Sequence, residues 1–204
     1  GPTPAFDEMY SMLYDDDELK KILWFIGATL TNEMVNIEKF LYLYGSKGSG
    51  KGTMIKLIEM LFEGYYDAIN LNVLTGNSEF ATGQIKEIPV LLDSDADIRS
   101  IKNDTDLLKM TAHETIVVNR KYREPYPVRF TGLLVAASNQ PYSVRNIDSG
   151  IMRRAVVARP TGNKHDHKTY VQLMNQIKFE LPQVAYKAIQ LFYSMGPGYY
   201  EDYV

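Results

Sequence analysis

Apolar runs separated by polar and glycine-rich segments divide the chain into alternating strand-like and helix-like stretches. Four short apolar runs predict buried strands, at residues 40–44, 88–92, 133–137 and 155–158. Apolar residues recur at helical spacing in four other stretches, at residues 19–30, 54–62, 104–111 and 168–195. Strands that alternate with helices predict an α/β fold with a mainly parallel sheet, covered by helices on both faces.

Charged and turn-forming residues mark the ends of these elements. Residues 15–18 are four consecutive acids, which favour the positive end of a helix dipole. Pro182 interrupts the helical pattern of the tail, so we expect two helices with a break at this residue. Two further strand-like runs, 115–119 and 127–130, flank a charged tip and predict a β-hairpin.

The pattern divides the chain into three expected parts. A short helical N-terminal segment covers residues 1–36, an α/β core covers 37–160, and a helical C-terminal tail covers 161–204. The chain begins Gly-Pro without Met, which resembles the scar of a cleaved tag at residues 1–2. We therefore expect this chain to be a piece of a longer protein.

Composition favours a globular protein without a membrane segment. The chain has 204 residues, of which 45% are hydrophobic and 23% charged, and no apolar run approaches the length of a membrane span. The absence of cysteine excludes disulfides and thiolate metal sites, and it fits a cytoplasmic setting. The charge is uneven: residues 1–98 carry a net −9 and residues 99–204 a net +6, so the second half suggests an anionic partner.

The most specific motif follows the first predicted strand. Residues 45–51 read Gly-Ser-Lys-Gly-Ser-Gly-Lys, which fits the pattern G-x-x-x-x-G-K of phosphate-binding loops between a strand and a helix. Glycines let successive backbone N–H groups point at a phosphate, and the lysine reaches the β- and γ-phosphates. The residues expected to bind ATP are Gly45, Ser46, Lys47, Gly48, Ser49, Gly50, Lys51, Gly52, Thr53 and Met54.

One position departs from this pattern. Gly52 stands where a Ser or Thr would bind Mg²⁺, and the hydroxyl comes one place later, at Thr53. The metal would then be held through water, or by Thr53 after a small shift. Gly-Lys-Gly-Thr also occurs in adenylate kinases and their relatives, which leaves a nucleotide kinase open as an alternative.

Polar residues end two of the predicted strands. Asp93 ends the second and is our choice for the metal site, while Asp95 is the second candidate and the possible base that polarises water. A solvated acidic loop is the alternative for all three acids that alternate here, Asp93, Asp95 and Asp97. Asn139 ends the third strand, where an amide could hold the attacking water, although a turn-forming role before Gln140 also explains it.

The order of these motifs resembles superfamily 3 helicases, in particular the helicase domains of phage, plasmid and poxvirus primase-helicases. The matching segments are 43–53, 90–95, 107–122, 133–141 and 148–157. The resemblance implies an AAA+ P-loop ATPase fold, a hexameric ring and ATP-driven movement along single-stranded DNA. It also implies a primase or primase-polymerase module earlier in the parent chain, and an N-terminal segment that helps to form an oligomerisation collar.

The resemblance carries two further sets of residues. Segment 108–114 looks like the motif before a DNA-gripping hairpin, so the expected DNA contacts are Lys109, Arg120, Lys121, Tyr122 and Arg123. Segment 148–154 looks like the source of an arginine finger, with Arg154 preferred over Arg153. A solvated hairpin and a surface ion pair are the respective alternatives.

Together these features predict an ATP-dependent DNA helicase motor domain of viral or phage replication, with Mg²⁺ as the metal. The expected catalytic residues are Lys51, Asp93, Asp95, Asn139, Arg153 and Arg154, and the expected metal ligands are Thr53 and Asp93. A nucleotide kinase and a non-hydrolysing ATP-binding assembly module are the alternatives. We interpret residues 165–167, His-Asp-His, as a solvated turn and not as a metal site.

Overall fold

The computed structural model describes the whole chain except residues 77, 98–100, 102, 141–149 and 201–204. The helices are α1 (Pro4–Leu13), α2 (Asp16–Leu30), α3 (Lys51–Leu61), α4 (Leu71–Leu74), α5 (Thr105–Thr111), α7 (Gly150–Arg154) and α8 (His167–Met195), with 3₁₀ turns η1 (Met34–Asn36) and η2 (Ala81–Gln84). The strands are β1 (Phe40–Tyr44), β2 (Tyr66–Ala68), β3 (Val90–Asp93), β4 (Thr115–Val118), β5 (Tyr126–Arg129), β6 (Leu133–Ser138) and β7 (Ala155–Ala158).

Five strands form one parallel sheet in the order β2-β3-β6-β1-β7. This confirms the predicted mainly parallel sheet, including all four strands expected from the apolar runs. Because the strands are parallel, the residues that follow β1, β3 and β6 all lie on the same side of the sheet, the side where the strands have their carboxyl ends. The edge strand β2 was not predicted, since its three residues include no apolar run.

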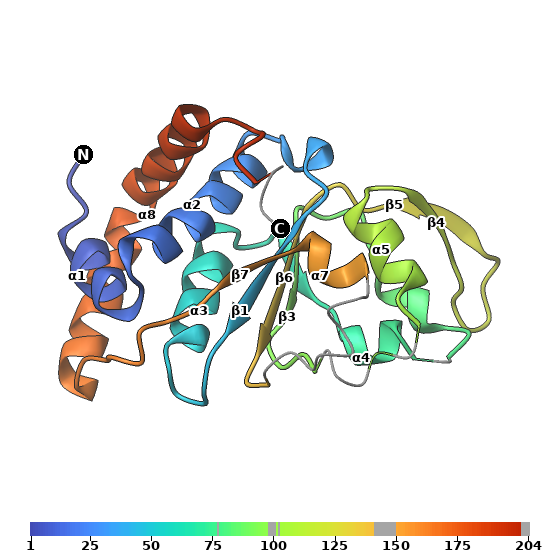
Figure 1. The fold of residues 1–204 in the computed structure, drawn as a ribbon, viewed down its shortest axis with the longest axis horizontal. Helices are drawn as coiled ribbons and strands as arrows, with labels where there is room; N and C mark the ends of the chain where they lie inside the picture. Colours follow the sequence, from blue (N-terminus) through green and yellow to red (C-terminus); the bar gives the residue numbers. More distant parts are fainter. Residues whose placement is uncertain (77, 98–100, 102, 141–149, 201–204) are drawn as a thin grey trace.

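Alternate residues of each strand enter two separate cores. Leu41 and Leu43 of β1 pack with α1, α2, α3 and α8, whereas Phe40 and Tyr42 pack with α4, α5, α7 and the hairpin. Figure 1 shows these two layers on opposite sides of the sheet. The burial of both faces explains why the strands are continuous apolar runs.

The expected break at Pro182 is wrong, because α8 is a single helix of 29 residues with Pro182 inside it. A proline in a helix interior costs about 3 kcal/mol, since it removes a backbone hydrogen bond. Ile177 and Val184 are buried on either side of Pro182, and α8 packs along both α1 and α2. Tertiary packing therefore holds the helix together across the proline.

The N-terminal segment and the C-terminal tail are packed together. The Glu180 carboxylate of α8 accepts hydrogen bonds from the backbone N–H groups of Ala5 and Phe6, at 3.1 and 2.9 Å, and so caps α1. Residues from all three expected parts of the chain contribute to the core on the α8 side. Among the described residues, no helix has the length and apolarity needed to cross a membrane.

Candidate functional site

The glycine-rich loop, residues 45–50, leads from the end of β1 into the start of α3. Gly48 and Gly50 have φ angles of 76° and 111°, which disfavour any residue with a Cβ atom. A Cβ atom at Gly45 would lie 2.7 Å from the Ser49 hydroxyl and 2.9 Å from Pro160. The loop thus requires glycine at three positions, and it presents backbone at the N-terminus of an 11-residue helix.

Lys51 is folded back onto this loop. Its ammonium group donates to the carbonyl oxygens of Gly45 and Ser46, at 2.6 and 2.9 Å. Burial lowers the pKa of Lys51, and the negative charge of Asp95 acts in the opposite direction. The Ser49 hydroxyl is buried and has no hydrogen-bond partner among the described residues. The loop therefore holds a cation and an unsatisfied hydroxyl, both of which suit a phosphate group.

The two acids at the end of β3, Asp93 and Asp95, have different environments. Both oxygens of Asp93 accept backbone hydrogen bonds, Oδ2 from Leu71 at 2.8 Å and Oδ1 from Asp95 at 3.0 Å. Asp93 is buried, and this burial raises its pKa. Asp95 is exposed, and its charge is close enough to influence Lys51. Asp95 is thus the more accessible of the two acids, whereas the carboxylate of Asp93, our choice for the metal site, is buried and already accepts two backbone hydrogen bonds.

The end of β6 lies between the acids and the glycine-rich loop. Ser138 pairs with Tyr44 across the strands, and its carbonyl oxygen accepts from the N–H of Gly45 at 3.2 Å. On the other side, the N–H of Ala96 donates to the carbonyl oxygen of Ala137 at 2.8 Å. The exposed Asn139 follows directly. The sheet thus brings Lys51, Asp95 and Asn139 to one edge, as their positions at strand ends suggested.

Arg153 and Arg154 lie on the opposite side of the sheet from the glycine-rich loop, where strand β1 begins. They end α7, and the next residue, Ala155, pairs with Phe40 at the start of β1. The length of β1, roughly 16 Å, separates this point from the loop of the same chain. Arg154 forms an ion pair with Glu38 at 3.1 Å, as the ion-pair alternative expected. Residues 148 and 149 of the same motif lie outside the described residues.

The predicted hairpin consists of β4 and β5, which pair in antiparallel fashion on the α5 side of the sheet. Its tip carries three of the four expected cations, Arg120, Lys121 and Arg123, in exposed or half-buried positions, whereas the exposed Lys109 lies in the last turn of α5. Arg120 lies over the ring of Tyr126 at 5.1 Å, and Lys121 lies over the ring of Tyr122 at 5.1 Å. Tyr122 is 92% exposed and has a φ of 61°, which is uncommon for a residue other than glycine.

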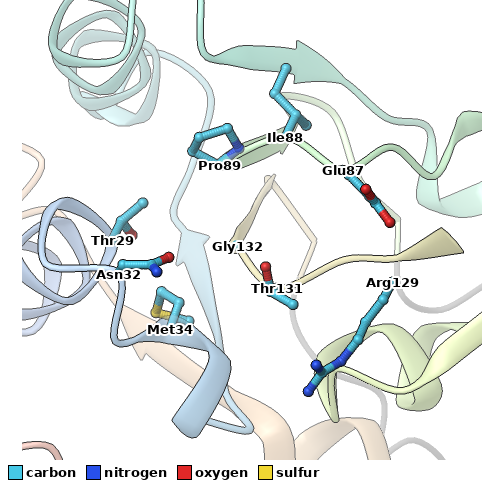
Figure 2. Close-up of a pocket in the computed structure, with 9 residues that line it drawn as sticks. All are labelled: Thr29, Asn32, Met34, Glu87, Ile88, Pro89, Arg129, Thr131 and Gly132. Atoms are coloured by element: carbon cyan, nitrogen blue, oxygen red, sulfur yellow. The ribbon is translucent and has the colours of Figure 1, made fainter.

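A separate cavity of about 380 Å³ lies at the edge of the sheet away from the loop. Figure 2 shows it between the end of α2, the start of β3 and the turn from β5 to β6. Arg129 on its rim donates through Nε to the carbonyl oxygen of His113 at 2.7 Å. The predicted site residues do not line this cavity. In the described part of the chain, no three His, Asp or Glu side chains gather as a metal site.

Comparison with known proteins then gives the family. The model of a family of unknown function, DUF5906, matches residues 43–154, which is more than half of the chain. The chain belongs to the DUF5906 family. The matched DUF5906 region begins just before the glycine-rich loop and ends at Arg154, so it contains every residue that we predicted for the site. A search among curated proteins finds no match.

Solved structures share the fold. The apo structure of the NrS-1 C-terminal region, residues 305–718, is 16% identical, with a TM-score of 0.68, and the alignment covers 94% of this chain and 50% of that one. A second apo form is 18% identical, with a TM-score of 0.63, and the alignment covers 86% and 43% of the two chains. This member of DUF5906 thus spans about half the length of these structures.

Proposed function

We propose that this chain is the ATP-hydrolysing motor domain of a ring-forming DNA helicase of the superfamily 3 type. The observation that carries the proposal is the position of the glycine-rich loop at the end of β1, with Asp95 and Asn139 on the adjoining edge of the sheet. This edge, at the carboxyl ends of parallel strands, is where α/β proteins commonly bind nucleotides.

The loop residues fit a triphosphate. Lys51 would exchange its bonds to the carbonyls of Gly45 and Ser46 for phosphate oxygens, which are stronger partners because they are charged. The Ser49 hydroxyl would gain the partner that it lacks among the described residues. The N-terminus of α3 adds a favourable dipole for negative charge.

Asp95 and Asn139 would supply the metal contact and the water contact that hydrolysis needs. Asp95 and Thr53 would hold Mg²⁺, directly or through water, and the bound ion would neutralise charge on the β- and γ-phosphates. Asn139 would orient the attacking water through its amide, which can donate and accept hydrogen bonds. Asp93 would keep the β3 end in place through its bonds to Leu71 and Asp95.

A guanidinium from a neighbouring copy completes the proposed site. Arg154 is at the wrong edge of the sheet to reach the loop of its own chain. In a ring of identical subunits, one edge of each subunit can face the opposite edge of the next. Arg154 would then stabilise transition-state charge on a neighbour's γ-phosphate, so hydrolysis would require assembly.

The β4–β5 hairpin would contact DNA. Three cations and an exposed tyrosine gather at its tip, and they suit the phosphates and bases of a single strand. The N-terminal half of the chain carries a net charge of −9, which argues against binding along the whole surface. We therefore place DNA at the hairpin alone, where hydrolysis could move it.

The central test is the rate of ATP hydrolysis with and without single-stranded DNA. We expect stimulation by DNA, loss of activity in Lys51→Ala and Arg154→Ala, and wild-type activity in the exposed α8 variant Lys178→Ala. Mixing the two inactive variants should restore part of the activity, because a Lys51→Ala subunit can lend its Arg154 to a neighbour with an intact loop. Full activity in Arg154→Ala at dilutions that give monomers would refute the ring.

The products distinguish the two alternative functions. A nucleotide kinase would transfer the phosphoryl group to a nucleoside monophosphate, whereas the proposed motor releases inorganic phosphate. An assembly module would bind ATP without turnover, in the presence or absence of DNA. Measuring phosphate release and nucleoside diphosphate formation in the same reaction separates all three functions.

A further inference from the structure

A pocket of about 670 Å³ lies directly beside the glycine-rich loop. This volume is within the range of roughly 300–1,000 Å³ that is typical of small-molecule sites. Its walls come from three parts of the chain, namely Met9 and Leu13 of α1, Gly48, Gly50, Gly52, Thr53 and Lys56 of the loop and α3, and residues 164–167 and Tyr170 at the start of α8. Two of these parts lie outside the expected ATPase core.

The segment that leads into α8 is fixed against α1. The backbone N–H of Thr161 donates to the carbonyl oxygen of Leu13 at 2.8 Å, and the Thr161 hydroxyl donates to that of Met12 at 2.7 Å. A ring nitrogen of His165 lies 3.3 Å from the carbonyl oxygen of Glu8. Residues 165–167, expected to be a solvated turn, thus form one side of a defined hollow.

Helix α1 is in turn fixed against the loop and α3. The Tyr10 hydroxyl donates to the carbonyl oxygen of Thr53 at 2.9 Å. A Cβ atom at Gly50 would lie 3.1 Å from Cδ2 of Leu13, so the loop backbone and this leucine are in close contact. An apolar wall therefore adjoins the backbone that would hold the phosphates.

Aromatic side chains line the far side of the pocket. The ammonium group of Lys56 lies 3.1 Å from the Tyr170 hydroxyl and 5.6 Å from the centre of its ring. The rings of His167 and Tyr170 are 6.4 Å apart and inclined by 23°. Asp166 caps α8 by accepting from the N–H of Thr169 at 2.7 Å, which fixes the turn that presents these rings.

We infer that this pocket binds the nucleoside of a purine nucleoside triphosphate, with the base against Leu13 and Tyr170 and the phosphates on the glycine-rich loop. The inference rests on the proposed function, and it extends the site to α1 and α8. An aromatic ring and an apolar wall suit the flat faces of a base, and a purine offers more area to them than a pyrimidine. Nucleotide would then hold both helical segments against the core.

The test compares ATP with inorganic tripolyphosphate, both with Mg²⁺, by calorimetric titration of the full chain. Tyr170→Ala should weaken ATP binding at least about tenfold and leave tripolyphosphate binding unchanged. Tyr170→Phe keeps the ring and should bind ATP as the wild type does. Tyr193→Ala removes an exposed tyrosine from the other end of α8 and is the matched control.

The outcomes separate the pocket from the phosphate site. ATP that binds more tightly than tripolyphosphate and CTP, and loses this advantage in Tyr170→Ala, supports the inference. Tripolyphosphate that binds as tightly as ATP, or a Tyr170→Ala variant with normal ATP affinity, overturns the inference and leaves the loop as the phosphate site. A wild-type chain that binds neither ligand overturns the proposed function as well.

Discussion

The Arg154 guanidinium forms an ion pair with the Glu38 carboxylate at 3.1 Å, at the edge of the sheet farthest from the glycine-rich loop. The Glu38 side chain is 60% exposed, and such surface pairs contribute about 0–1 kcal/mol. In the proposed ring, Arg154 has to leave Glu38 to reach a neighbouring nucleotide.

We therefore predict that Glu38→Gln changes stability by less than about 1 kcal/mol and raises DNA-stimulated ATP hydrolysis by up to about fivefold. Steady-state phosphate release and urea unfolding provide the two measurements. A slower variant would mean that Glu38 positions the arginine for its task and does not compete with a phosphate.

Substitution at Gly52 tests the proposed magnesium site. A Cβ atom at this position would meet no other atom within 4 Å, so a larger side chain fits there. Gly52→Thr would place a hydroxyl after Lys51, where phosphate-binding loops usually carry their magnesium ligand. We predict an unchanged fold and half-maximal ATP hydrolysis at a lower Mg²⁺ concentration. Gly52→Val has nearly the same shape without the hydroxyl, so a similar shift in both variants would contradict a metal contact.

Much of the sheet could be predicted because strands buried on both faces leave a continuous apolar run, as in β1 and β6. The edge strand β2 leaves no such signal. Pro182 was misleading because local propensity predicts a break, whereas contacts of α8 with α1 and α2 preserve the helix. Local sequence patterns thus predict an element correctly where it is buried along its whole length. They fail where contacts with residues far away in the sequence determine whether the element forms.

The site residues also divide into those whose positions local sequence patterns predict and those whose positions depend on contacts with distant residues. Lys51, Asp95 and Asn139 could be placed together because each follows or ends a strand of one parallel sheet. The orientation of Asp93 depends on the N–H of Leu71, 22 residues away, which no local pattern reveals. The pocket at α1 and α8 depends on bonds such as that from Thr161 to Leu13, between residues far apart in the sequence.

The two acids at the end of β3, Asp93 and Asp95, should respond differently to loss of charge. Asp95→Asn should lower ATP hydrolysis at least about 100-fold with little change in stability, because its side chain is exposed. Asp93→Asn should destabilise the fold by roughly 1–3 kcal/mol, because the amide nitrogen that replaces one oxygen cannot accept a hydrogen bond from Leu71 or Asp95, whereas both oxygens of a carboxyl group can do so in either charge state.

The effect of Asp93 should also depend on pH. Burial raises its pKa in the folded state, so its contribution to stability is fully present below the ordinary value of 3.8 and is lost as pH rises through the folded-state pKa. The difference in unfolding free energy between wild type and Asp93→Asn should therefore be larger at acidic than at neutral pH. A difference that grows toward neutral pH would contradict this assignment.

Glu180 tests how firmly α1 is held. Its buried carboxylate satisfies two backbone donors in the first turn of that helix, those of Ala5 and Phe6. Glu180→Gln keeps one good acceptor and loses the charge, so we predict a destabilisation of about 1–3 kcal/mol in urea unfolding. The exposed Gln190→Ala on the same helix should have a smaller effect. If the pocket beside α1 binds nucleotide as inferred, ATP should also bind Glu180→Gln more weakly.

The hairpin tip should determine how DNA binding depends on salt. Replacing Arg120, Lys121 and Arg123 together by alanine should weaken single-stranded DNA binding and reduce the slope of log affinity against log salt by about 0.7 for each phosphate that these cations neutralise. Tyr122→Ala should weaken binding without changing this slope, since stacking on a base involves no net charge.

The matched control removes the same charge from α8, through alanine at Lys168, Lys178 and Lys187. Fluorescence anisotropy at several salt concentrations measures both the affinity and the slope. If the α8 triple variant loses as much affinity and slope as the hairpin variant, then DNA responds only to total charge. The hairpin would in that case be no DNA site, because a localised contact requires that equal charge removed elsewhere has a smaller effect.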